Sequence, residues 1–229
     1  MKNKQKDKLI YYRWFKGVAS LKQWIKLLSL ALIVALGGCN NKTEVKIFST
    51  LNDYIANQNE CNVNNQILTD LISTEADIYN DLIERGLDSF NEVAPLFEEG
   101  KKNTQESHEY LTQYQTCILK GRLDEQVLRK EIDTIKDVTV KSETEELVTK
   151  YVQYETALIN YVDSLLKLNT TQSEFYTSVN ETTTMSQLDE LVTTINSAIN
   201  VVSDDTLIHQ QSSEEFNRSY TSYYEKYIQ

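Results

Sequence analysis

The sequence predicts an all-α protein, an elongated antiparallel helical bundle with coiled-coil-like packing that follows an N-terminal signal peptide. Residues 40–229 contain only three glycines and one proline, whereas β sandwiches and α/β enzymes need frequent turns or glycine-rich loops. Apolar residues in the same stretch recur at spacings of three and four, the period of one helix face. Since no linker divides this stretch, we expect a single helical domain over residues 47–229.

The clearest helix is predicted from Leu147 onward. Spacings of four and three alternate along it for more than four heptads. This seam comprises Leu147, Tyr151, Tyr154, Leu158, Tyr161, Leu165, Leu168, Phe175 and Val179. An amphipathic bundle helix and a two-chain coiled coil both produce this spacing, and the tyrosines favour a bundle with partly hydrated edges. The spacing leaves open whether the partner of the seam lies in the same chain.

A second long helical segment is predicted from about Met185 to the C-terminus. Its apolar face comprises Leu188, Leu191, Ile195, Ala198 or Ile199, Val202, and then Phe216, Tyr220, Tyr223 and Tyr227. We expect a turn at 182–186 with Ser186 as a possible N-cap. Residues 203–205 either interrupt the helix or cap it again.

Shorter helices are predicted before residue 147. The asparagine-rich stretch 57–66 frays or ends the first of them, because asparagine side chains compete for backbone hydrogen bonds. Gly86 to Ser89 predicts a helix end followed by a new start. We expect a second bend at 100–103 and a short helix that begins at Leu123–Asp124.

The first 38 residues have the pattern of a secretory signal peptide. Residues 1–26 carry a net charge of +7, and the apolar run 27–38 has 12 residues, fewer than the roughly 20 that span a bilayer. Leu36-Gly37-Gly38-Cys39 resembles the lipobox of bacterial lipoproteins. The resemblance implies that the signal peptidase recognises Leu36, Gly37 and Gly38, and that Cys39 carries diacylglycerol and begins the mature chain. An uncleaved membrane anchor and ordinary secretion are the alternatives.

This interpretation places the protein on the outer, extracytoplasmic face of the cell membrane, held by the lipid on Cys39. Residues 39–46 would form the lipidated terminus and a short tether. Residues 40–229 carry 15 basic and 33 acidic residues, a net charge of −18 that argues against binding nucleic acid. Apart from the covalent lipid, we expect no cofactor.

The other two cysteines, Cys61 and Cys117, are equidistant from the predicted break at residue 89. If the chain folds back there, the two thiols fall opposite each other and can form a disulfide outside the cell. Two unpaired buried thiols are the alternative. Two cysteines without nearby histidines do not make a zinc site.

No catalytic pattern is present, so we expect a protein that is not an enzyme. Glycine-rich phosphate loops, GxSxG, HExxH and EF-hand patterns are all missing from the sequence. We expect His108 and His209 to be surface residues, and adjacent carboxylates such as Glu98 and Glu99 to lie on a solvated face. A solute-binding lipoprotein would need far more glycine-containing turns than this chain has.

The layout resembles the YkyA-like family of cell-wall-binding lipoproteins of low-GC Gram-positive bacteria. The similarity comprises the lipobox, Val45-Lys46-Ile47-Phe48, the segment EADIYNDLIERG at residues 75–86 and the later tyrosine seam. It covers residues 45–227 and implies a helical lipoprotein at the membrane's outer face. The resemblance carries over no binding residues.

We therefore predict a structural or interaction role in the cell envelope, with membrane lipid and either peptidoglycan or an envelope protein as partners. Exposed tyrosines stack on sugars, which makes Tyr220, Tyr223, Tyr224 and Tyr227 the candidate binding surface. Core packing is the alternative role for these tyrosines, and Tyr224 lies off their stripe and should be the exposed ring. The rival functions are an accessory subunit of a membrane-protein complex and a carboxylate enzyme.

Overall fold

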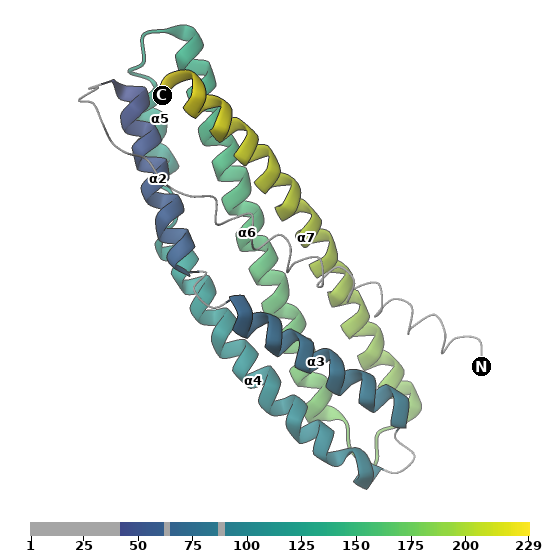
Figure 1. Ribbon diagram of the computed structural model, residues 1–229. Coiled ribbons are helices and arrows are strands. Elements are labelled where there is room, and N and C mark those ends of the chain that lie inside the picture. Colours follow the sequence, from purple (N-terminus) through teal and green to yellow (C-terminus); the bar gives the residue numbers. More distant parts are fainter. Residues whose placement is uncertain (1–41, 62–64, 87–89) are drawn as a thin grey trace. The chain divides into compact units, whose positions relative to one another are not determined.

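The computed structural model describes residues 42–61, 65–86 and 90–229, and the ordered elements in them are all helices (Figure 1). They are α2 (Thr43–Cys61), α3 (Asn65–Arg85), α4 (Phe90–Lys120), α5 (Glu125–Ile132), α6 (Val138–Ser178) and α7 (Met185–Tyr227). The described residues form no strand. The prediction of an all-α helical bundle is confirmed.

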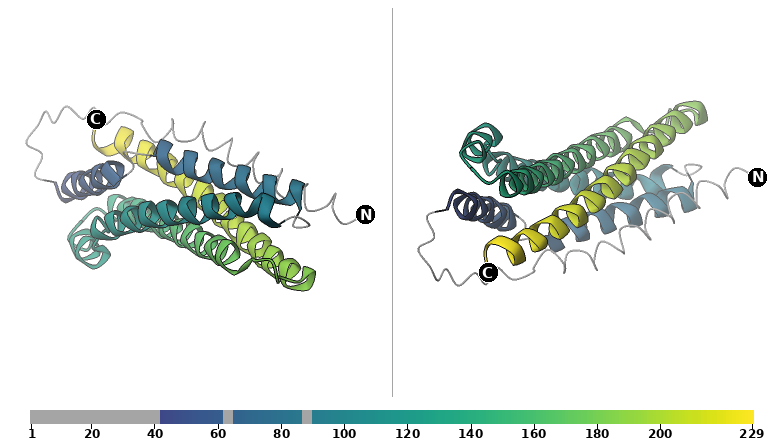
Figure 2. Two further views of the ribbon diagram at one scale, coloured as in Figure 1. Left: turned by 90° about the horizontal axis from the view of Figure 1, so that it is seen from below. Right: turned by 90° about the horizontal axis from the view of Figure 1, so that it is seen from above.

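Helix α6 is the element that most other described helices pack against. It contacts α2, α4, α5 and α7, while α3 packs on α4. Helix α7 packs on α6, and Figure 2 shows the two helices meeting at the turn that joins them. The seam from Leu147 to Phe175 is buried apart from Tyr161, which is half-buried. The partners of the seam therefore lie within the same chain.

The turn between α6 and α7 forms where the sequence predicts it, but its N-cap differs. Thr184, and not Ser186, caps α7. The Gln187 backbone N–H donates to Thr184 Oγ1 at 3.4 Å, and the Thr184 backbone N–H donates to Gln187 Oε1 at 2.9 Å. This reciprocal capping box satisfies two backbone N–H groups at the start of the helix. Ser186 could not form such a box, because the residue three positions later is neither glutamine nor glutamate.

Two predicted interruptions are absent. Helix α7 continues through residues 203–205, and α4 continues through 100–103. Gly100 marks a close helix approach and not a bend, because a Cβ there would lie 2.4 Å from Cε1 of Tyr176 on α6. Glycine is the residue that lets α4 and α6 pack at this distance.

The boundaries of the helices before α6 lie close to the residues that were predicted to end or start a helix. Helix α2 ends at Cys61, inside the asparagine-rich stretch, and α5 begins after its N-cap Asp124. Gly86 has a φ of +73° and its N–H donates to Leu82 O at 3.0 Å, so it ends α3 in a conformation that favours glycine. Residues 43–46, expected in the tether, form the first turn of α2.

A disulfide joins the end of α2 to α4. Cys61 and Cys117 are bonded, with Cα atoms 5.7 Å apart and a sequence separation of 56. The bond closes a loop that contains all of α3 and most of α4. Cross-linking a loop of this length lowers the entropy of the unfolded chain.

Opening this loop should destabilise the whole helical body. We expect the Cys61→Ala/Cys117→Ala variant to lose about 4 kcal/mol of unfolding free energy, the loop-entropy value for a separation of 56 residues. Urea unfolding followed by circular dichroism measures this loss. Dithiothreitol should destabilise the unsubstituted chain by a similar amount and leave the double variant unchanged. Equal stability of the two chains without reductant would contradict the prediction.

Candidate functional site

The predicted lipidation site lies outside the described residues. The structure begins at Lys42, so Cys39 and the recognition residues Leu36, Gly37 and Gly38 are not part of it. The lipid anchor therefore stays a prediction from sequence. The remaining candidate site residues are all described.

The four candidate tyrosines lie at the end of α7, where it meets α2 and α6. The Tyr220 hydroxyl donates to Asn52 Oδ1 on α2 at 2.7 Å. The Tyr223 hydroxyl and Thr144 Oγ1 on α6 share a hydrogen bond of 2.7 Å, and both side chains are buried. Both of these hydroxyls thus bond to neighbouring helices.

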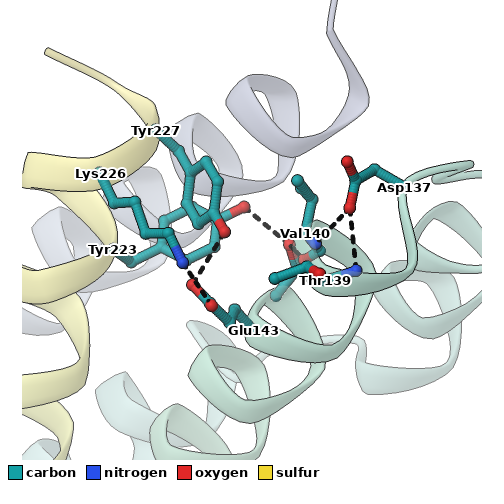
Figure 3. A network of polar contacts seen from close by, with 8 residues as sticks. Asp137, Thr139, Val140, Glu143, Tyr223, Lys226 and Tyr227 are labelled. Atoms are coloured by element: carbon teal, nitrogen blue, oxygen red, sulfur yellow. Dashed lines mark hydrogen bonds and ion pairs between the residues drawn. The ribbon is translucent and has the colours of Figure 1, made fainter.

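Tyr227 and its neighbour Lys226 hold a second contact between α7 and α6 (Figure 3). The Tyr227 hydroxyl donates to Glu143 Oε2 at 2.9 Å, and Lys226 Nζ donates to Glu143 Oε1. These donors, Lys226 first, lower the pKa of the Glu143 carboxyl. Asp137 lies at the start of the same helix and accepts from the N–H groups of Thr139 and Val140 (Figure 3).

Tyr224, which we expected to be exposed, is half-buried. Its ring centroid lies 5.9 Å from that of Phe48 on α2, which also stacks on Tyr220 at 4.8 Å and Tyr223 at 6.0 Å. Phe48 therefore contacts Tyr224, which lies off the stripe, as well as two tyrosines on it. The tyrosines form an aromatic clasp (Tyr220, Tyr223 and Tyr224 around Phe48, with Tyr227 against Tyr223) that holds α7 to α2.

A buried polar cluster that the sequence analysis missed joins α3, α4 and α6. Glu75 on α3 accepts a hydrogen bond from the Tyr176 hydroxyl at 2.7 Å and from Asn103 Nδ2 at 3.0 Å. Asn103 Nδ2 also donates to Leu71 O at 3.1 Å. Glu75 is 5% exposed, so protein groups surround its carboxyl.

Burial has the largest effect on the pKa of the Glu75 carboxyl. It raises the pKa of the carboxyl from 4.5 to about 7, against the smaller lowering effect of the hydrogen bonds from Tyr176 and Asn103. A carboxyl with such a pKa is suited to proton transfer in an open cleft. Here the aromatic rings of Tyr79, Phe97 and Phe175 pack around the cluster, so the arrangement joins helices and offers no reactive group to solvent.

Glu155 on α6 forms a second buried polar contact, between α2 and the α4–α5 connection. Its Oε1 accepts from Gln58 Nε2 at 3.2 Å and from the Leu123 N–H at 3.1 Å, and its Oε2 lies 3.7 Å from Arg122 Nε. Burial raises the pKa of the carboxyl, and the Leu123 N–H and Arg122 offset part of this rise. Glu155 thus satisfies a backbone donor just after α4 ends.

The prediction that His209 is a surface residue is wrong. Its ring lies 5.5 Å from that of Tyr154 and 5.8 Å from that of Tyr161, both on α6. Nε2 is buried without a hydrogen-bond partner, and burial lowers the pKa of the imidazole to about 4. The neutral ring therefore packs as an aromatic residue. His108 is exposed, as expected.

The described residues provide no group of three or more histidine, cysteine, aspartate or glutamate side chains that could bind a metal ion. Within the same residues, each helix is too short or too polar to cross a membrane. The titratable groups whose pKa values are shifted most are buried between helices.

A comparison with protein families identifies the chain. The family model described as "YkyA: Putative cell-wall binding lipoprotein" matches residues 42–226. The protein belongs to the YkyA family. No curated protein sequence and no solved structure matches it.

The YkyA match begins one residue before α2 and ends one residue before α7 does. It therefore includes the disulfide, the buried clusters around Glu75 and Glu155, and most of the aromatic clasp. The name of the YkyA family describes a lipoprotein, in agreement with the lipobox resemblance at Leu36–Cys39.

The buried Glu75 carboxyl predicts a specific pH dependence of stability. Its pKa of about 7 in the folded chain exceeds 4.5, the value for an unburied carboxyl. The folded chain therefore binds more protons between these values, and stability is lost as the pH rises through 7. The loss from this group should reach about 3 kcal/mol at pH 8.

Glu75→Gln should remove this loss, because the amide imitates the protonated carboxyl. Urea unfolding of both chains between pH 4.5 and pH 8 isolates the effect as the difference between two curves. His209 contributes with the opposite sign, because its lowered pKa makes the chain less stable as the pH falls from 6.5 to about 4. This contribution is the same in both chains and therefore cancels in the difference. A difference that does not change with pH would contradict the assignment.

Proposed function

We propose that the protein is a lipoprotein attached to the outer face of the cell membrane through an acyl-glyceryl group on Cys39. The lipobox resemblance at Leu36-Gly37-Gly38-Cys39 supports this proposal, as does the name of the matching family. Two or three acyl chains on one cysteine suffice for stable attachment, since each buried CH₂ contributes about 0.8 kcal/mol.

We further propose that the helical body binds the cell wall, with peptidoglycan as the ligand. The family match over residues 42–226 is the observation that carries this proposal. Helix length supports it: α6 has 41 residues, which at 1.5 Å per residue is roughly 60 Å. A lipid-anchored body with helices of this length can reach material well outside the bilayer.

The buried carboxyls favour a binding role over an enzymatic one. Glu75 and Glu155 have the environments most unlike water, and each is 5% exposed or less. Their hydrogen-bond partners come from neighbouring helices. A carboxylate enzyme would need such groups to face a substrate.

The aromatic clasp is not the surface that we now propose for wall binding. Three of its hydroxyls bond to α2 or α6, and the rings of Tyr220, Tyr223 and Tyr224 pack on Phe48. Removing a tyrosine from it would alter the packing of α7 and give no clear test of binding. The binding surface is better sought on the solvent-facing sides of the long helices.

Sedimentation with purified Gram-positive sacculi tests wall binding directly. The protein would be residues 39–229 with Cys39→Ser, so that no lipid is attached. We expect cosedimentation that persists at moderate salt and is stronger after teichoic acid is removed, because a chain with a net charge of −18 is repelled by anionic polymers. Leu147→Asp, which places a charge in the core, provides a control that should abolish binding by unfolding the bundle.

Absence of binding to both sacculus preparations would contradict wall binding. The accessory-subunit function would then be the one to test, by pull-down of the lipidated chain from detergent-solubilised membranes. A stable protein partner without wall affinity would support that function.

A further inference from the structure

The two ends of α6 differ in composition, and one of them lies close in sequence to the predicted lipid. We define the Val138 end as the start of α2, residues 133–138 and the last turn of α7. We define the Met185 end as the end of α6, residues 179–184 and the first turn of α7. Helix α6 separates the two ends by roughly 60 Å, given its 41 residues.

Contacts between elements show that the Val138 end is one continuous surface. Lys46 on α2 pairs with Glu131 at 2.6 Å, and Thr43 Oγ1 lies 3.5 Å from Thr134 Oγ1. The last turn of α7 is fixed to α6 by the pairs that Tyr227 and Lys226 make with Glu143 (Figure 3). The starts of α2 and α6 and the end of α7 are therefore held together.

The chain length outside the structure limits how far this surface can lie from the lipid. Thr43, the first residue of α2, follows Cys39 by four residues. Four extended residues span at most about 14 Å. If Cys39 carries the lipid, the start of α2 lies within that distance of the lipid attachment point.

Charge also distinguishes the two ends. At the Val138 end, Lys46, Lys141 and Lys226 each pair with a carboxylate, and Lys42 and Lys136 are exposed in addition. No lysine or arginine lies between Lys167 and Arg218, and four of the eight aspartates and glutamates in this stretch lie at or near the Met185 end: Glu174, Glu181, Asp189 and Glu190. The five lysines at the Val138 end are offset by the carboxylates of Glu44, Glu131, Asp133, Asp137, Glu143 and Glu225, so this end is close to neutral. An anionic bilayer surface therefore repels it less than it repels the acidic Met185 end.

Val138 is an exposed apolar residue at the end that lies close in sequence to the predicted lipid. It is the first residue of α6 and is 81% exposed, the most exposed of the large hydrophobic residues in the described part of the chain. Lys136 and Lys141 lie near it in the sequence, with Asp137 between them. Met185 at the other end is also exposed, at 69%, but no lysine or arginine lies near it in the sequence. An exposed apolar residue with lysines near it is typical of side chains at a membrane interface.

We infer that the Val138 end lies on the lipid head groups and directs the Met185 end away from the membrane. This inference rests on the proposed lipidation of Cys39. The anchor then does more than retain the protein: through a tether of only a few residues, it fixes which end of the helical body faces lipid.

A single fluorescent label at each end tests the orientation in the lipidated full chain. Val138→Cys and Met185→Cys are a matched pair, because both residues begin a long helix and are 81% and 69% exposed. Cys61 and Cys117 are bonded to each other and Cys39 carries the lipid, so the introduced thiol alone reacts with the dye. The proteins would be reconstituted in vesicles of phosphatidylcholine and phosphatidylglycerol that contain a lipid with a quencher near the head group.

We expect the label at position 138 to be quenched at least about twofold more than the label at 185, with a blue-shifted emission. Equal quenching, or stronger quenching at 185, would overturn the inferred orientation. Flotation of the vesicles provides the independent readout of the anchor. Protein that does not float would refute lipidation and with it the basis of the inference, whereas protein that floats with equal quenching would refute the orientation alone.

Discussion

A series of buried polar contacts along α6 fixes the alignment of the other helices. From its start to its end, Thr144 bonds to Tyr223 on α7, Glu155 to Gln58 on α2, Asn169 to the Thr104 carbonyl on α4, and Tyr176 to Glu75 on α3. Apolar seams with alternating spacings of three and four fit equally well after a shift of seven residues, so apolar packing alone would leave the register open. Each polar contact is satisfied at one alignment only, because a shift would leave a buried donor or acceptor unpaired. The long helices of this chain can therefore be almost free of glycine and proline and still pack in one arrangement.

The sequence predicted the helices well because each has a long apolar stripe, and it predicted the polar contacts poorly because spacing does not identify partners. Glu75 continues the stripe of Leu68, Ile72, Tyr79 and Leu82, and His209 lies seven residues from both Val202 and Phe216. A carboxylate or imidazole at a seam position was the available signal for burial. We interpreted His209 by its usual surface preference and did not single out Glu75. The partners of Glu75 lie 28 and 101 residues away, so no local pattern could supply them. The tyrosines of α7 show the same limit, since the stripe was correct while Phe48, which determines their role, lies on α2.

With the proposed lipid on Cys39, these features would give a membrane-attached body whose helices are connected and whose two ends differ. The disulfide and the aromatic clasp both involve α2, the helix nearest to the predicted lipid, and connect it to α4 and α7. The proposed attachment ahead of α2 would therefore act on the whole bundle and not on a single separate helix. The long acidic stretch on α6 and α7 would keep that side of the body away from an anionic bilayer and available to the wall. Membership of the YkyA family agrees with a role of this kind.

The central claim is that one end of the body faces lipid and the other meets the wall. The most direct test places a photoreactive amino acid at Met185 or at Val138 in producing cells, irradiates them, and measures the protein that stays with the sacculi after boiling in detergent. The account predicts wall-retained protein from position 185 and much less from position 138, where lipid should be the product. Equal retention from both positions, or none from position 185, would contradict it.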